Sequence, residues 1–247
     1  MVFMLPYLFD FMAGLGIGFI AGLLGVGGGF LIVPVLVFLG EPIHVAIGTS
    51  LACITLSSLA SAHTHLRRGA VLFKVVVLKE AFSIPLAVAG AYVSTMIPER
   101  GLRVVFAALL LYLSYALAKN SSERHHVEEG DINYSRVPIV GVLSGFMSGL
   151  LGISGGILNV PLFHAYIGIP IRYAVGTSSL ALFFTALAGT IGHYHLGQVD
   201  LETALLLAPG LVLGAYLGAV TAHRIHPSNL KRIFAVFLAV MAIKMLL

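Results

Sequence analysis

Long apolar stretches separated by short polar turns run along nearly the whole chain. The first five lie at roughly 5–24, 30–40, 43–66, 71–97 and 101–118. Five more follow at roughly 137–152, 157–168, 171–194, 199–222 and 229–247. A helix needs about 20 apolar residues to cross a bilayer, and several of these stretches reach that length. The pattern therefore predicts an all-α polytopic membrane protein.

Two of the stretches, 30–40 and 157–168, are too short to cross alone. Each contains a proline, Pro34 or Pro161, and each follows a glycine-rich break. Such a pair of segments is either one broken span or a re-entrant hairpin that enters the membrane and returns. Paired interrupted helices in the two halves of a chain are typical of secondary transporters.

The glycine-rich break occurs twice, 127 residues apart, within an eighteen-residue segment whose two copies are identical at ten positions. Phe19–Leu36 reads FIAGLLGVGGGFLIVPVL, and Phe146–Phe163 reads FMSGLLGISGGILNVPLF. The triplets Gly48-Thr49-Ser50 and Gly176-Thr177-Ser178 also correspond. We therefore predict two membrane repeats of about five helical segments, 1–118 and 137–247, joined by a polar linker over 119–136.

Charge distribution decides between the two topologies, because Lys and Arg accumulate in cytoplasmic loops. If each short segment belongs to one broken span, the basic residues divide evenly between the two sides. If each makes a hairpin, nine lie on the side of the linker and only Arg100, Arg103 and Lys244 lie opposite. The hairpin arrangement is therefore favoured. It makes the repeats inverted, puts the linker in the cytoplasm and places both termini outside.

Composition excludes most other classes of protein. Hydrophobic residues make up 59% of the chain and charged residues 10%, against about 45–50% and about 25% in soluble domains. Cys53 is the single cysteine, so an internal disulfide and a cysteine-based metal cluster are excluded. No basic patch with interleaved aromatic residues indicates nucleic-acid binding.

The glycine-rich breaks are candidates for a binding site. An unpaired backbone group in hydrocarbon costs several kcal/mol, so irregular backbone at this depth lines protein or a wet cavity. The half-helix after each break would direct its free N–H groups and partial positive charge into that site, as an anion requires. The residues concerned are Gly25, Gly27, Gly28, Gly29, Gly152, Ser154, Gly155 and Gly156. The alternative is close helix packing, the role we expect for Gly14-x3-Gly18-x3-Gly22.

Polar side chains near the breaks extend this candidate site. The hydroxyls of Thr49, Ser50, Thr177 and Ser178 either donate to the oxygens of an anion or bond back to carbonyls of their own helices. Asn159 stands where the first copy has Ile32. This difference breaks the symmetry of the site and would give substrate preference.

Ionisable residues inside the apolar stretches are candidates for proton coupling, namely Glu80, His63 and His193. For Glu80 the alternative is a pair with Lys79, although adjacent residues on a helix do not face each other. For the histidines, together with His65 and His195, the alternative is a polar cap at the membrane surface. A four-histidine metal site is disfavoured because inverted repeats put the two pairs on opposite faces. We therefore expect no metal and no cofactor.

The doubled motif, each copy followed by Gly-Thr-Ser, resembles the TauE/SafE family of membrane permeases over almost the full chain. The resemblance implies transport of sulfur-containing anions such as sulfite, sulfoacetate or related organosulfonates, usually as export. Its motif falls on Gly25, Gly27, Gly28, Gly29 and Pro34, then on Gly152, Gly155, Gly156, Asn159 and Pro161, with Ser154 in place of a glycine.

These inferences together predict a secondary transporter of the cell membrane, with no enzymatic activity, that exports a small sulfur anion by alternating access. Its partners would be the anion and the bilayer, with no nucleic acid; a homo-oligomer is compatible with the sequence. The alternatives are an anion channel and a histidine-dependent metal-handling membrane protein.

Overall fold

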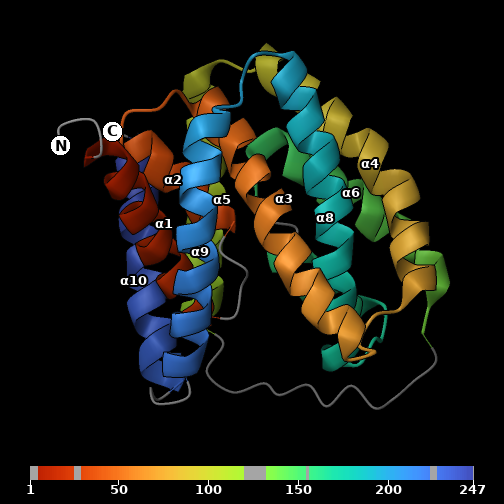
Figure 1. Cartoon of the computed structure of the whole chain (residues 1–247). Helices are drawn as coiled ribbons and strands as arrows, with labels where there is room; N and C mark the ends of the chain where they lie inside the picture. Colours follow the sequence, from red (N-terminus) through yellow and green to blue (C-terminus); the bar gives the residue numbers. More distant parts are fainter. Residues whose placement is uncertain (1–4, 25–28, 120–131, 154–155, 223–226, 247) are drawn as a thin grey trace.

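The computed structural model describes residues 5–24, 29–119, 132–153, 156–222 and 227–246, and these are almost entirely helical (Figure 1). The first half contains α1 (Leu5–Leu24), α2 (Gly29–Phe38), α3 (Ile43–Arg67), α4 (Phe73–Met96) and α5 (Glu99–Lys119). The second contains α6 (Val137–Leu151), α7 (Gly156–Pro161), α8 (Ile171–His195), α9 (Leu201–Ala222) and α10 (Pro227–Leu246). A 3₁₀ turn at Tyr134–Arg136 precedes α6, and a π-helical turn at Leu162–Tyr166 follows α7.

The predicted segments are confirmed, and their ends have local causes. Pro42 and Pro170 stand immediately before α3 and α8, and their carbonyls accept the amides of Ala46 and Ala174 in the first turns. The π-helical turn begins directly after Pro161, which cannot donate a backbone hydrogen bond, so the helical ladder is interrupted there.

Five helical stretches in the described part of the chain are long and apolar enough to cross a membrane. They are Ile43–Arg67, Phe73–Met96, Tyr134–Leu151, Ile171–His195 and Leu201–Gly218. Large apolar side chains lie exposed on the outer surface, among them Val77, Leu205 and Val236. Lipid is the solvent that suits such a surface. The prediction of an all-α polytopic membrane protein is confirmed.

The two halves interlock. Helix α1 of the first half packs along α9 of the second, and α6 of the second packs along α4 of the first. Helices α3 and α8 cross at the centre of the molecule (Figure 1). Helix α5 pairs with α10. Exchanging the corresponding helices of the two halves turns the α1–α9 contact into the α6–α4 contact. The same exchange leaves the α3–α8 and α5–α10 contacts unchanged.

The central helices α3 and α8 run in opposite directions. The hydroxyls of Thr55 and Thr190 lie 3.4 Å apart, and Ser61 donates to Ser179 at 3.1 Å. Residue numbers therefore rise along α3 as they fall along α8. Because the two helices occupy the same position in the two halves, corresponding elements point in opposite directions at the centre of the fold.

The short helix of each half turns back along the helix before it. In the second half the Asn133 amide, just before α6, donates to the carbonyl of Ile167 at 3.0 Å. The end of the π-helical turn therefore lies beside the start of α6, although α7 begins just after α6 ends. In the first half α2 ends at the end of the bundle where α1 begins (Figure 1). The short segments form hairpins, the arrangement that the charge distribution favours.

Glycines bring the helices of different halves into backbone contact. A Cβ on Gly14 or Gly18 of α1 would overlap the carbonyl of Leu207 or Leu211 in α9, which confirms the packing role predicted for these two glycines. The sequence analysis missed the equivalent ladder on α6, where Gly141, Gly145 and Gly149 lie against the carbonyls of Lys79, Ser83 and Ala87 in α4. The same four-residue spacing was available as a signal.

Candidate functional site

The two glycine motifs meet at a single serine. The Ser50 hydroxyl, two turns into α3, lies 3.1 Å from the Gly29 carbonyl and 2.8 Å from the Gly152 carbonyl. Gly29 closes the first motif and begins α2, whereas Gly152 opens the second motif and follows α6. One fully buried hydroxyl therefore lies within hydrogen-bond distance of a carbonyl from each break and shares its single hydrogen between them. The two breaks lie more than 100 residues apart in the sequence.

Gly152 is held in a conformation that suits glycine alone. Its φ of 65° lies in the left-handed region, and its amide donates to the Ser148 carbonyl at 2.8 Å to close the end of α6. A Cβ there would lie 2.7 Å from the Ile47 carbonyl of α3. Both the backbone conformation and the contact with α3 therefore require glycine.

The threonines of the two Gly-Thr-Ser triplets have a role that the sequence analysis did not foresee. Thr49 accepts a hydrogen bond from the Asp200 amide, and Thr177 accepts one from the Leu72 amide, each at 3.0 Å. These amides precede α9 and α4, whose first N–H groups lack helical partners. Each threonine therefore caps a helix of the other half.

The glycine of each triplet makes room for the same turn. A Cβ on Gly48 would overlap the carbonyl of Gln198, and one on Gly176 would overlap the carbonyl of Ala70. Glycine and threonine together dock the turn that precedes α9 or α4, whereas Ser50, which follows Thr49, lies at the two breaks.

Several buried polar side chains of the second half have no hydrogen-bond partner among the residues that the structure describes. Both amide atoms of Asn159 and the hydroxyl of Ser178 are in this state. The hydroxyls of Ser144 and Ser148 on α6 also lack a partner, and these two residues were not predicted from the sequence. All four residues are at most 2% exposed. Buried polar groups of folded proteins are almost always paired, so this group requires an explanation.

Most of the other residues of the predicted glycine site belong to segments that the structure does not describe. Gly25, Gly27, Gly28, Ser154 and Gly155 lie outside the described residues, and most of the linker 119–136 does as well. Gly156 is described and begins α7.

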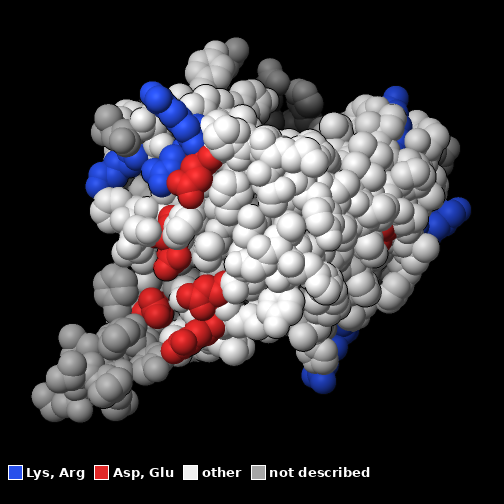
Figure 2. Space-filling view, turned by 90° about the horizontal axis from the view of Figure 1, so that it is seen from above, with Lys and Arg blue, Asp and Glu red and all other residues white. Residues whose placement is uncertain are grey.

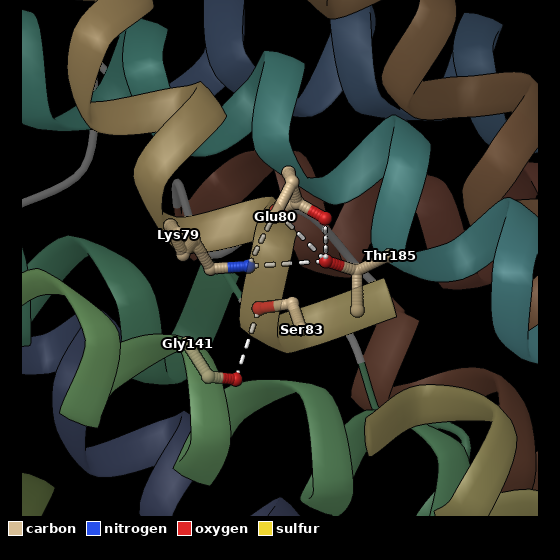
Figure 3. A network of polar contacts seen from close by, with 5 residues as sticks. All are labelled: Lys79, Glu80, Ser83, Gly141 and Thr185. Atoms are coloured by element: carbon tan, nitrogen blue, oxygen red, sulfur yellow. Dashed lines mark hydrogen bonds and ion pairs between the residues drawn. The ribbon is translucent and has the colours of Figure 1, made fainter. Parts of the chain in front are cut away.

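Lys79 and Glu80 form a buried ion pair in the middle of the bundle (Figure 3). The Lys79 ammonium lies 2.7 Å from a Glu80 carboxylate oxygen and 3.0 Å from the Thr185 hydroxyl of α8. The same hydroxyl donates to Glu80, with its oxygen 2.8 Å from the nearer carboxylate oxygen. Adjacent helix positions diverge, but the long lysine side chain folds back to its neighbour. The objection from helix geometry in the sequence analysis was wrong.

The two histidines named for proton coupling lie in different surroundings. His193 is fully buried, with Nε2 2.8 Å from the Gly149 carbonyl and Nδ1 2.8 Å from the Gln198 side-chain oxygen. His63 is exposed near the end of α3. Because α3 and α8 are antiparallel, the two residues lie at opposite ends of the bundle. No group of three or more His, Cys, Asp or Glu side chains within the described residues could hold a metal ion.

Replacing Ser50 by alanine is expected to destabilise the protein by about 1–3 kcal/mol, because the carbonyls of Gly29 and Gly152 then lose a buried donor. Ser94→Ala is the matched control, since Ser94 is equally buried but donates only to Ala91 of its own helix. The free energy of unfolding in detergent measures both. An equal loss in the two variants would show that the bridge contributes nothing.

Known proteins are similar in sequence to this chain over most of its length. The family model described as sulfite exporter TauE/SafE matches residues 11–245. A probable membrane transporter protein of Methanocaldococcus jannaschii is 29% identical, with 96% of this chain and 94% of that protein aligned. Two probable membrane transporter proteins of Bacillus subtilis are 30% and 32% identical. The first alignment covers 91% of this chain and 92% of the relative, and the second covers 82% and 85%. No solved structure matches. The chain belongs to the sulfite exporter TauE/SafE family.

Proposed function

We propose that this protein is a secondary transporter that exports a small sulfur-containing anion, such as sulfite or an organosulfonate, across the cell membrane. The observation that carries the proposal is the meeting of both glycine-rich breaks at Ser50, inside a bundle of apolar helices. The family description and the names of the relatives support the same class of function.

The chemistry of the breaks suits an anion. Helix α2 begins at Gly29, and the α7 segment begins at Gly156, so the positive end of each helix lies at a break. The partial positive charge of a helix start attracts an anion without a fixed cation. A site of this kind binds sulfite or sulfonate and releases it again, as transport requires.

Alternating access follows from inverted repeats, which we propose for the two halves. The antiparallel course of α3 and α8 and the exchanged contacts of α1 with α9 and α6 with α4 support this assignment. In transporters built from inverted repeats, one half rocks against the other around a fixed central site.

Charges at the two ends of the bundle support an orientation. One end of the bundle contains the α3–α4 turn and the starts of α6 and α8. Four arginines lie there: Arg67 and Arg68 at the turn, Arg136 before α6 and Arg172 at the start of α8. At the opposite end Asp10 lies within electrostatic range of Asp200 and Glu202. Figure 2 looks down on that end and shows acidic side chains gathered at one side of it. By the positive-inside rule the arginine-rich end faces the cytoplasm, which puts the linker inside and the termini outside.

Reconstitution into vesicles tests the proposal. Vesicles loaded with unlabelled sulfite are expected to take up labelled sulfite by saturable exchange. An anion channel would conduct without such counterflow. Failure to move sulfite, sulfoacetate and methanesulfonate, with transport of a divalent metal instead, would overturn the proposal and favour the histidine-dependent alternative.

Proton coupling is the second part of the proposal, and the Lys79–Glu80 pair is its candidate site, because an ionisable group at membrane depth is commonly functional. The double variant Lys79→Met/Glu80→Gln is expected to retain sulfite exchange and to lose sulfite accumulation driven by a pH gradient. Measuring both fluxes in the same vesicles separates coupling from binding. Accumulation at the wild-type level in this variant would exclude the pair.

A further inference from the structure

Three of the unpartnered polar side chains of the second half stand close in sequence to residues of a single apolar cluster. A small apolar cluster packs Val140 of α6, Phe163 of the π-helical turn and Ala174 of α8 together. Ser144 and Ser178 lie four residues after Val140 and Ala174, about one α-helical turn on the same face. Asn159 lies four residues before Phe163, on the other side of Pro161.

The three four-residue intervals, from the apolar cluster to Ser144, Asn159 and Ser178, also run in the same direction along the bundle. Helix α6 runs alongside α4, since Gly141, Gly145 and Gly149 meet Lys79, Ser83 and Ala87 in the same order. Helix α8 is also parallel to α4. Thr185 contacts Lys79, and Gly192, further along α8, contacts Val88 and Ala91, further along α4. Helix α7 runs back along α6. Moving from Val140 to Ser144, from Phe163 to Asn159 and from Ala174 to Ser178 is therefore a move toward the glycine break.

Ser148 extends this group by one more turn, and the four residues are called the polar layer. It follows Ser144 on the same face of α6 and lies three residues before the end of that helix. Asn159 lies three residues after the start of α7. Counted from the helix ends Asn159 is level with Ser148, and counted from the apolar cluster it is level with Ser144, so it lies within about one helical turn of both serines.

We propose that Ser144, Ser148, Asn159 and Ser178 form the part of the site that recognises the oxygen atoms of a small oxyanion, sulfite or a sulfonate. This inference rests on the proposed function. Three hydroxyls and one amide offer up to five hydrogen atoms and no charge. A group with three exposed oxygens uses such donors, and neutral donors allow it to leave. Four of the five buried polar atoms without protein partners, the three hydroxyls and the Asn159 amide nitrogen, become satisfied when the anion binds.

The first half lacks this layer, which makes recognition asymmetric. By the 127-residue repeat, Ile17, Ala21 and Ile32 stand where the second half has Ser144, Ser148 and Asn159, and all three are buried in the large apolar core. Ser50, the counterpart of Ser178, is occupied by the two backbone carbonyls. The first half therefore contributes apolar packing beside the site, and the second half contributes the side chains that donate hydrogen bonds to the ligand.

Asn159→Leu and Ser148→Ala test the layer in the full-length protein in detergent. Each removes an unpaired buried polar group without changing the shape much. The unliganded protein is therefore expected to melt at the same or a higher temperature than wild type. Binding of sulfite and of methanesulfonate, followed by thermal shift, is expected to weaken about 10- to 100-fold, as for a lost hydrogen bond to a charged group. Chloride serves as the control anion, and Ser94→Ala as the control variant, since its hydroxyl is bonded within its own helix.

The outcomes separate the two proposals. Wild-type affinity for both probes in Asn159→Leu and Ser148→Ala, with binding intact in wild type, would overturn the recognition layer and leave the transporter proposal standing. A lower melting temperature of the unliganded variants with unchanged affinity would assign these side chains a purely structural role. Absence of any response to sulfur anions in the wild-type protein, together with absence of sulfite exchange, would overturn the transporter proposal itself.

Discussion

Lys79→Met is expected to lower the free energy of unfolding by about 3–5 kcal/mol, because it leaves the Glu80 carboxylate buried without its cation. Both side chains are almost fully removed from solvent, and the sole other partner that the described contacts give the carboxylate is the hydroxyl of Thr185. Denaturant unfolding of the detergent-solubilised protein at neutral pH measures the loss.

The double variant Lys79→Met/Glu80→Gln is the control for this prediction. A buried ion pair can be replaced by neutral side chains of similar size at little cost, since removing both charges also removes both desolvation penalties. Its stability is therefore expected to return to within about 1 kcal/mol of wild type. A double variant as unstable as Lys79→Met alone would mean that the lysine side chain stabilises the fold by packing, not by charge.

The helices were predictable because apolar length and breaker residues are local features. The ten apolar stretches correspond closely to the helices, and the hairpin topology followed from the positions of the basic residues. The packing role of Gly14 and Gly18 was also predictable, since small residues four apart indicate a close helix contact.

The contacts of the site were not predictable, because they join residues that are distant in the sequence. Nothing local to Thr49 indicates that it caps α9 through Asp200, and nothing local to Ser50 indicates that it joins two breaks. The pairing of Lys79 with Glu80 depends on a flexible side chain that a helical wheel does not describe. Ser144 and Ser148 did carry a signal, two serines one turn apart on an apolar helix.

Gly152→Ala is expected to damage binding far more than an alanine at a glycine with the same backbone conformation. An alanine in the left-handed region costs about 1–2 kcal/mol wherever it stands. At Gly152 its Cβ would also lie 2.7 Å from the Ile47 carbonyl, so α3 and the end of α6 must separate. That separation moves the carbonyl that Ser50 holds and the break that follows it. We expect sulfite affinity to fall about tenfold or more, since ~1.4 kcal/mol lost at a site changes its equilibrium constant tenfold.

Gly197 and Gly69 supply matched controls, because they separate backbone strain from the contact with α3. Their φ values are 69° and 62°, close to the 65° of Gly152, and a Cβ on either would meet nothing within 4 Å. Gly197→Ala and Gly69→Ala should therefore lose stability through φ alone and keep wild-type affinity for sulfite in the thermal-shift titration. If Gly152→Ala binds sulfite as they do, the contact between Gly152 and Ile47 has no part in the site. If its affinity alone falls, the junction of the second break with α3 belongs to the binding machinery, and the meeting of the two breaks at Ser50 is functional as well as structural.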